Sequence, residues 1–382
     1  MASVYLDCNA TTPVAPEVVA AMLPFLQEHF GNPSSAHACA DAPRRAMAAA
    51  RENTARLIGA RASEIVFTGS ATEANNLALL GVARALGGAR RHAVISAVEH
   101  PSVSEPARRL QELGGAVTVV PVDEYGRVAP GDVAAALRSD TGLVSVMHAN
   151  NEVGTIQPIA EIAALAHRHG ALMHTDAAQS AGKLALDVDA LGVDLLTLAG
   201  HKFCAPKGIG ALYVRTGTPI TAVLAGAGQE RGLRPGTENI PLIVALGAAA
   251  RLARERLPET HAHLRALRDR LHARLAQEIP GLALNGHPGQ RLPNTLNVSF
   301  PGVSGALLLQ RAADRVAAAT GSACHAGDAA PSGVLGAMGL PGARAAGAVR
   351  LSVGRYTREN EIDAAAAVLI AAWRERAVAE HG

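Results

Sequence analysis

The stretch between residues 171 and 210 constrains the fold most, because it contains two apolar runs that each end in chemically reactive residues. The first run, AlaLeuMetHisThr at 171–175, stops at Asp176, and the second, at 194–199, stops at GlyHisLys, whose last residue is Lys202. A helix-like segment and a turn separate the runs, as in a strand–helix–strand unit of a parallel sheet. Ligands of such sheets bind beyond the carboxyl ends of the strands. We therefore expect Asp176 and Lys202 to face one crevice.

Lys202 has two interpretations on its residues alone. A lysine in a loop is most often a surface charge. This lysine follows an apolar strand and a histidine, however, and an amine in a cleft is suited to forming a Schiff base. Pyridoxal 5'-phosphate chemistry needs such a lysine together with an acidic partner for the pyridine nitrogen, and Asp176 is placed to be that partner.

Composition indicates a globular protein and argues against several partners. The chain has 382 residues, of which 49% are hydrophobic and 18% charged, enough for about two domains with a large core. A net charge of +2 and an aromatic content of 3% disfavour nucleic acid as a partner. The most apolar window, 240–250, is too short to cross a membrane, and the N-terminus has no signal-peptide pattern.

The cysteines predict neither a metal site nor a disulfide framework. Cys8, Cys39, Cys204 and Cys324 are widely scattered, and none has a partner at zinc-binding spacing. We therefore expect a reducing compartment, the cytoplasm.

Two motifs in the organising stretch, HTDAAQSAGK and HK…PKGIGALYVR, resemble the cysteine desulfurases of the class V aminotransferase group. The resemblance extends from Tyr5 to about Glu361 with the motifs in family order. It implies an α/β protein of the pyridoxal-phosphate-dependent transferase fold type I. A mainly parallel sheet would be covered by helices on both faces, beside a smaller α+β domain, and the strand–helix alternation points the same way. We place the large cofactor-binding domain at 14–258, and the small domain, with the catalytic cysteine loop, at 1–13 and 259–382.

A phosphate site is predicted after the apolar strand 65–68. The small-residue stretch 69–76 leads into a helix, and such a start is either an anion site or a plain capped helix with Thr72 near the cap. The resemblance to the family stretch FTSGATEANN implies that Ala71 and Thr72 bind the cofactor phosphate. Ala199 stands where the family usually has serine, so His201 and the helix start are expected to compensate for the missing hydroxyl.

The resemblance also implies roles around the cofactor ring. His100, in the GluHisPro stretch, would stack on the ring and relay protons, although a lone histidine after a strand is more often structural than catalytic. Asn151 would lie near the cofactor O3′ and the substrate carboxylate, with Gln179 as a second donor to O3′. Thr237, in the long loop 225–239, would reach the phosphate of a neighbouring subunit, which implies a homodimer with shared sites. Arg350 would grip the substrate carboxylate, a task suited to a bidentate guanidinium.

Cys324 is the predicted nucleophile. A cysteine is in general more often a small buried hydrophobe. Glycine, serine and polar residues surround this one at 318–327, and His325 beside it favours a thiolate. The stretch GlySerAlaCys matches the desulfurase motif SSGSACxS, which implies that Cys324 takes sulfur from L-cysteine as a persulfide and releases L-alanine. The sulfur would pass to an acceptor protein, such as one for iron–sulfur cluster assembly, or to a small thiol.

Other functions stay open at this point. GlySerAlaCysHis and LeuSerValGlyArg also resemble selenocysteine lyases, which assays with cysteine and selenocysteine side by side would distinguish. Another pyridoxal-phosphate enzyme, an aminotransferase or decarboxylase, would share Lys202 and Asp176 but have no use for the cysteine loop. A non-catalytic binding or scaffold protein would lack the visible absorption of the lysine-bound cofactor.

Overall fold

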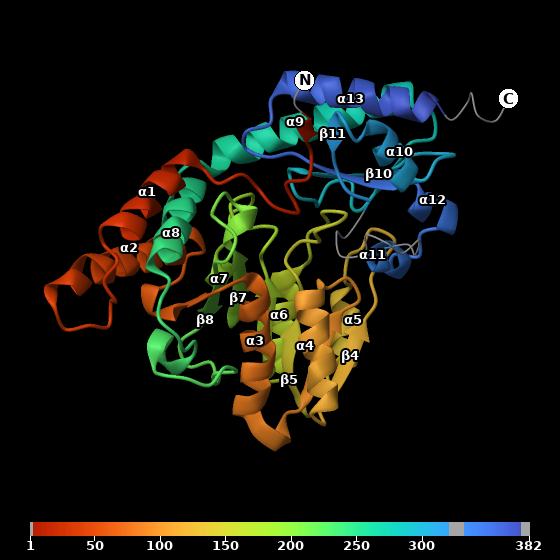
Figure 1. Ribbon diagram of the computed structural model, residues 1–382. Helices are drawn as coiled ribbons and strands as arrows, with labels where there is room; N and C mark the ends of the chain where they lie inside the picture. The colour runs from red at the N-terminus through yellow and green to blue at the C-terminus, as the bar shows by residue number, and fades with distance from the viewer. Residues whose placement is uncertain (1–2, 321–331, 376–382) are drawn as a thin grey trace.

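A seven-stranded sheet forms the centre of the larger part of the molecule, in a computed structural model that describes residues 3–320 and 332–375 (Figure 1). The strand order is β2-β8-β7-β6-β5-β3-β4. Strands β3 to β7 run parallel, whereas β8 is antiparallel to both of its neighbours. The bounds are β2 (Ile65–Thr68), β3 (His92–Ser96), β4 (Ala116–Val120), β5 (Thr141–Ser145), β6 (Leu172–Asp176), β7 (Leu195–Ala199) and β8 (Gly210–Val214).

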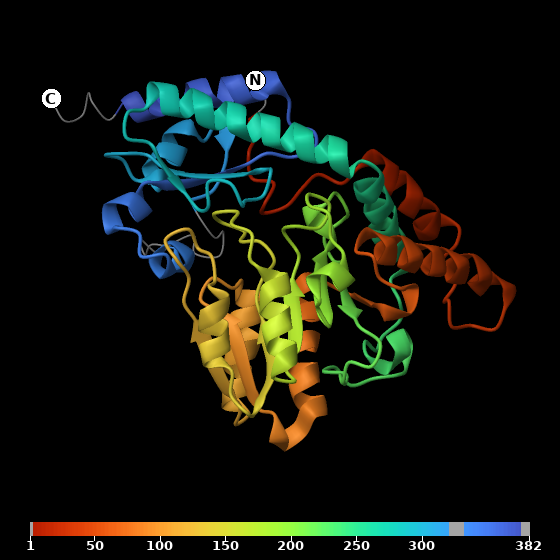
Figure 2. The same ribbon diagram turned by 180° about the vertical axis from the view of Figure 1, so that it is seen from behind.

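Helices cover both faces of this sheet because successive strand residues point to opposite sides. Val94 of β3 belongs to one core and its neighbour Ile95 to the other. Figure 1 shows α3 and α4 in front of the sheet, and Figure 2 shows helices of the opposite face in yellow. The face of Ile95 packs against α3 (Ala71–Leu86) and α4 (Pro101–Glu112); the face of Val94 packs against α2 (Asp41–Leu57), α5 (Pro130–Ala136), α6 (Ile159–Arg168) and α8 (Ile240–Glu255), with α1 (Pro16–Gln27) against α8. The predicted fold class is confirmed.

A second core lies in the smaller part of the molecule. It is built on the antiparallel sheet β12-β10-β9, and β1 pairs in parallel with β11, which brings the N-terminal segment into this part. The long helices α9 and α13 lie together along its outer side (Figures 1 and 2). The bounds are β1 (Val4–Tyr5), α9 (Leu257–Glu278), β9 (Ala283–Asn285), β10 (Thr295–Ser299), α10 (Gly305–Ala312), β11 (Val316–Ala317), α11 (Gly333–Ala337), α12 (Gly342–Ala346), β12 (Ala348–Ser352) and α13 (Glu359–Arg374). The domain limits predicted at 13/14 and 258/259 remain a proposal that the separate cores support.

Two local predictions need correction. The segment between β6 and β7 contains only the four-residue helix α7 (Val188–Leu191), because the chain after Asp176 first forms turns through residues 177–184. Strand β8 was not predicted as a strand, although its apolar run follows the motif that contains Lys202. No helix in the described ranges is long and apolar enough to cross a membrane.

Candidate active site

A cavity of about 250 Å³ lies at the carboxyl ends of strands β3, β5, β6 and β7. Predicted site residues from five separate segments meet there, which confirms that Asp176 and Lys202 face one crevice. Its lining consists of the predicted Ala71, Thr72, His100, Asn151, Asp176, Gln179, His201 and Lys202, together with Ser70, Ser102, Met147, Ala149, Ala178 and Ala199. The predicted Thr237 and Arg350 do not line it, and Cys324 and His325 lie outside the described residues.

Lys202 ends a short 3₁₀ turn, Gly200–Lys202, directly after β7. Its Nζ donates to the backbone carbonyls of Asn9 at 2.6 Å and Ala10 at 2.8 Å. The N-terminal segment is tied to the same turn, because the backbone N–H and Oγ1 of Thr12 both donate to the carbonyl of His201. The N-terminal segment 9–12 therefore lies beside the amine of Lys202.

Asp176 is buried at the end of β6 and holds two donors. Its Oδ2 accepts from Asn75 Nδ2 at 2.7 Å, and its Oδ1 accepts from the Ala178 N–H at 2.8 Å. Asn75 Nδ2 also donates to Ser102 Oγ at 2.8 Å, and Ser102 Oγ bonds His100 Nδ1 at 2.8 Å. Asn75 and Ser102 were missed as site residues, although Asn75 stands inside the predicted phosphate motif.

His100 is a neutral hydrogen-bonding group in this site. It caps α4, and its Nδ1 accepts the N–H of Ser102 at 3.1 Å, so the proton of the neutral ring is on Nε2. Burial lowers the pKa of His100, Asp176 opposes this effect, and Lys202 adds to it. The ring can therefore donate from Nε2 without carrying a positive charge at neutral pH.

The start of α3 lies at one end of the cavity and has the free N–H groups that suit it to an anion. Ser70 caps the helix by accepting the Glu73 N–H at 3.1 Å, and the N–H groups of Ala71 and Thr72 lie in the first turn, where no intrahelical acceptor exists. Strand β8 passes against this turn so closely that a Cβ at Gly210 would lie 2.9 Å from the Ala71 nitrogen.

His201 can replace the phosphate-binding hydroxyl that is missing at Ala199 only as an uncharged hydrogen-bonding group. Burial, followed by the charge of Lys202, lowers the pKa of His201 to about 4. The ring is therefore uncharged at neutral pH, and the helix start supplies most of the attraction for an anion. An amine, a buried carboxylate and a helix start in one cavity are the groups that pyridoxal phosphate requires, so the residues present fit this cofactor.

Arg350, in β12, lies beside the cavity with its side chain only 3% exposed. Its Nη2 contacts Asp7 Oδ1 at 2.7 Å, and its Nη1 donates to the Asn151 carbonyl at 3.2 Å. Its buried Nε has no hydrogen-bond partner within the part of the chain that the structure describes. A guanidinium with a spare buried donor next to Asn151 is suited to binding a carboxylate.

The segment that contains Cys324 has both of its described ends next to this site. On one side, the backbone of Ala319 pairs with that of Arg350 through hydrogen bonds of 2.7 and 3.3 Å. On the other side, the Ser332 hydroxyl donates to the carboxylate of Glu152, the residue after Asn151.

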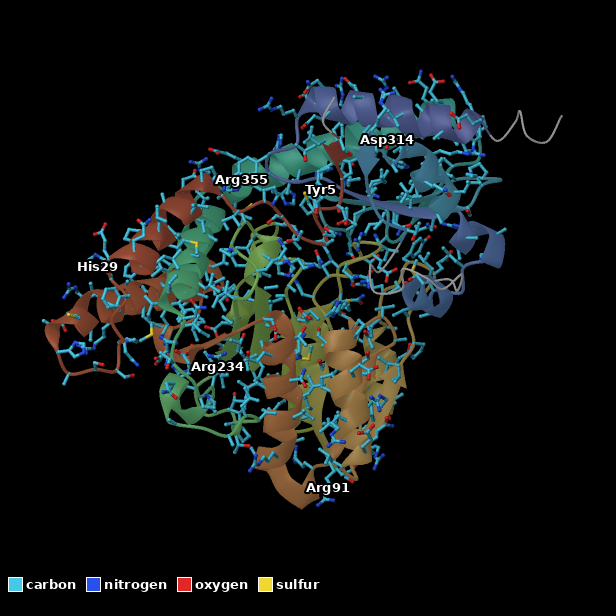
Figure 3. The ribbon with its side chains drawn as sticks, in the orientation of Figure 1. Tyr5, His29, Arg91, Arg234, Asp314 and Arg355 are labelled. Carbon is cyan, nitrogen blue, oxygen red and sulfur yellow. The ribbon has the colours of Figure 1, made fainter. Side chains whose placement is uncertain are left out.

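The loop 225–239 is fixed to the body of its own chain. Glu230 is buried, pairs with Arg51 at 2.5 Å and accepts the Phe67 N–H at 2.8 Å. Arg234, labelled in Figure 3 near the start of α3, pairs with Glu73 at 2.8 Å. Thr237 is exposed on this loop and does not line the cavity of its own chain.

Comparisons with known proteins agree with this geometry. The family model of class-V aminotransferases matches residues 4–365. The chain is 45% identical to the "Cysteine desulfurase IscS" of Dictyoglomus turgidum over 94% of this chain and 92% of that protein. A solved "NIFS-like protein" superposes with a TM-score of 0.90 at 37% identity, covering 97% of this chain and 98% of that one. The solved structure of "SspA in complex with cysteine" gives a TM-score of 0.83 at 38% identity, over 93% and 100% of the two chains.

Proposed function

The chain belongs to the class-V aminotransferase family as a pyridoxal-phosphate-dependent cysteine desulfurase, and from that premise we propose how its own residues perform the reaction. The observation that carries the proposal is the meeting of Lys202, Asp176 and the start of α3 in one cavity. When bound, pyridoxal phosphate supplies an electron sink for charge at the substrate Cα. We propose L-cysteine as the substrate, and the similarity to SspA, solved in complex with cysteine, supports this choice.

The aldehyde, pyridine nitrogen, phosphate and ring of the cofactor would each be held by residues of this cavity. Lys202 would bond to its aldehyde carbon, and the carboxylate of Asp176 would keep the pyridine nitrogen protonated. The N–H groups of Ala71 and Thr72 would bind the phosphate. The ring of His100, in the wall of the same cavity, would stack on the cofactor.

Asn151 and Gln179 would face the cofactor O3′, and Arg350 would bind the substrate carboxylate together with Asn151. The contact between Arg350 and the Asn151 carbonyl supports this pairing. Lys202 Nζ would take the proton from the substrate Cα and deliver it during product formation, and His100 would assist through Nε2–H.

Cys324 would act as the nucleophile. Its thiolate would attack the substrate sulfur, forming a sulfur–sulfur bond as the carbon–sulfur bond breaks. The electron pair of the broken bond would stay with carbon, which is protonated and released in L-alanine. The persulfide would then pass to an acceptor protein or a small thiol, and His325 would favour the thiolate.

The experiment that tests this proposal measures alanine and sulfide from L-cysteine for the parent and Cys324→Ala. We expect Cys324→Ala to bind pyridoxal phosphate normally and to lose at least about 100-fold in activity, the scale for loss of a covalent nucleophile. Cys39→Ala, at an exposed cysteine that does not line the cavity, is the matched control and should keep the parent activity. Near-parent activity in Cys324→Ala would refute the persulfide step. A parent that is inactive on cysteine and fast on selenocysteine would favour a selenocysteine lyase.

We also propose a homodimer in which Thr237 reaches the phosphate site of the neighbouring subunit. The anchoring of its loop supports this, because Arg234 pairs with Glu73 in the first turn of α3 and Glu230 accepts the N–H of Phe67 in β2, the strand before that helix. Glu230 and Arg231 have positive φ values of 48° and 60°, a cost of about 1–3 kcal/mol each that a surface loop without a task would not need. Location in the cytoplasm stays a prediction from the sequence.

A further inference from the structure

Lysine is rare in this chain and is confined to the region of the active site. Lysine and arginine together number 35, but only Lys183, Lys202 and Lys207 are lysines. Lys202 is the proposed cofactor-bonding residue, and Lys207 is exposed. Lys183 is buried, and the reaction described above gives it no task. An arginine could not replace it simply, because a guanidinium is larger and stays charged.

The contacts of Lys183 lead directly to a proposed cofactor ligand. Its Nζ donates to the Gln179 backbone carbonyl at 2.9 Å and to the side-chain Oε1 of Gln179 at 3.2 Å. The Nε2 of Gln179 then donates to the Asn9 carbonyl at 3.0 Å, the same oxygen that accepts from Lys202 at 2.6 Å. A single hydrogen-bonded path therefore joins the buried Lys183 to the half-buried Lys202 through the amide of Gln179.

This path determines which way the Gln179 amide is turned. The ammonium form of Lys183, which predominates below its pKa of about 7, has only donors, and a backbone carbonyl has only acceptors. With Lys183 on one side and Asn9 on the other, the amide oxygen must face Lys183 and the amide nitrogen must face Asn9. The opposite orientation would bring two donors together and two acceptors together in a buried site, which is costly.

The surroundings of Lys183 place it beside the cofactor cavity. Lys183 and Lys202 line a second, smaller cavity of about 40 Å³ with Cys8 and Cys204, whereas Gln179 and Lys202 line the larger one. Burial, followed by the charge of Lys202, lowers the pKa of Lys183 to about 7, and the charge of Arg350 lowers it further. Burial raises the pKa of both thiols, that of Cys8 to about 12, so neither is a thiolate counter-ion at neutral pH.

We propose that Lys183 is a positioning residue for the cofactor site, where its Nζ locks the Gln179 side-chain amide with Nε2 on the side of Asn9 and Lys202. This inference rests on the proposed contact of Gln179 with the cofactor. It adds a residue that touches neither cofactor nor substrate and acts through Gln179. The backbone of Lys183 is itself held from α9, since His261 Nδ1 contacts its carbonyl at 3.0 Å.

The test is a double-mutant cycle on Lys183→Met and Gln179→Leu, with Lys207→Met as the matched control at an exposed lysine. The measured quantities are the Kd for pyridoxal phosphate, the pH midpoint of its visible absorption band in the bound protein, and the melting temperature of the apo protein. We expect each single variant to weaken binding about tenfold and to shift the midpoint, and the double variant to be no worse than Gln179→Leu. Lys207→Met should match the parent.

Several outcomes would overturn the inference. If Lys183→Met lowers the melting temperature but keeps the parent Kd and the parent pH midpoint of the absorption band, Lys183 has a structural role only. If the effects of the two substitutions add in the double variant, Lys183 acts independently of Gln179. A parent-like Gln179→Leu would refute both the inference and the proposed Gln179 contact. The proposed role of Lys202 would still stand in each of these cases, because Lys202→Ala tests it separately.

A second measurement needs no substitution at Lys183. With three lysines in the chain, apo protein labelled with carbon-13 at lysine Cε gives three signals. We expect one of them to titrate near pH 7 and to move in Gln179→Leu. If no lysine signal responds to the loss of the Gln179 amide, the proposed contact does not exist in solution and the inference is wrong.

Discussion

At the scale of single residues, the site depends on groups whose charge is set by burial. Asp176 is buried with two donors on its carboxylate, while His100 and His201 have lowered pKa values and stay neutral. The positive charge and dipole of the cavity therefore come from Lys202 and the start of α3, with Arg350 beside it. Burial is the main cause of the lowered pKa of both histidines.

Lys202→Ala tests the predicted cofactor bond at this scale. The variant should lose the visible absorption of the lysine-bound cofactor and all measurable turnover, because no other amine lines the larger cavity among the described residues. Absorption spectroscopy and an alanine assay check this, with Lys207→Ala as a control that should match the parent. A Lys202→Ala variant with parent absorption and activity would instead indicate Lys207 as the reactive lysine.

Glu99 predicts a pH dependence of stability. It is buried beside Ser96 Oγ at 2.5 Å and the Met147 N–H at 2.9 Å, and burial raises its pKa from 4.5 to about 8. Between about pH 4.5 and 8, the carboxyl group of Glu99 therefore keeps its proton in the folded state and loses it in the unfolded state. The stability it contributes is complete below about pH 4.5 and is lost as the pH rises through 8.

Glu99→Gln, which mimics the protonated acid, should remove this loss. Relative to the parent, its free energy of unfolding should rise between pH 5 and 8, by at most about 1.4 kcal/mol per pH unit. Urea unfolding of the apo proteins across this range measures the difference. Parallel curves for the two proteins would show that Glu99 is ionised in the folded state throughout.

At the scale of elements, the phosphate end of the cavity depends on how closely β8 approaches α3. The side chain of residue 210 would have to occupy the space next to the backbone of Ser70 and Ala71. Residue 210 is glycine because a Cβ would clash with the neighbouring backbone. Its φ is not in the left-handed region, so backbone conformation is not the reason. Strand β8, which was not predicted, is therefore the element that packs closely against the start of α3, where we propose the phosphate binds.

Gly210→Ala should displace the start of α3. A Cβ would lie 2.7 Å from the Ser70 carbonyl carbon, so we expect cofactor binding to weaken at least about tenfold and the melting temperature to fall. Gly131→Ala is the control, because a Cβ there meets nothing within 4 Å. Equilibrium dialysis with pyridoxal phosphate and thermal unfolding measure the two effects. Parent-like binding by Gly210→Ala would mean that the helix start adapts without loss.

At the scale of the whole molecule, the site joins the two parts of the chain. The N-terminal segment leaves the small part, where β1 pairs with β11, and supplies the carbonyls that contact Lys202. Arg350 comes from the small antiparallel sheet and reaches Asn151 of the large part. The proposed dimer would add a third contribution, Thr237 from a second copy.

Subunit mixing tests the shared site. Thr237→Ala alone should weaken cofactor retention more than it weakens folding, and light scattering should show a dimer. In a mixed dimer of Lys202→Ala and Thr237→Ala chains, both substitutions fall in one of the two sites. The other site has the parent Lys202 from one chain and the parent Thr237 from the other. We expect mixing of the two variants to restore about half of the parent activity per mixed dimer. A fully active monomer, or no gain on mixing, would contradict the proposed arrangement.

What the sequence determined by itself was the kind of fold and the chemistry at the strand ends. Apolar runs followed by Asp176 and Lys202 predicted a parallel sheet with a site at its carboxyl edge, because parallel strands place their ends together. The apolar runs 65–68, 171–175 and 194–199 lie within one residue of the observed β2, β6 and β7. The resemblance located the family motifs, and the comparisons confirm the family.

Only the tertiary structure decided how those residues are held. Asn75 bridges Asp176 and Ser102, Arg350 contacts Asp7 from 343 positions away, and the amide of Gln179 lies between Lys183 and Asn9. Such contacts depend on side-chain direction across elements that are distant in sequence. Hydrophobic periodicity records which face of an element is buried, but it carries no information about which buried polar group meets which.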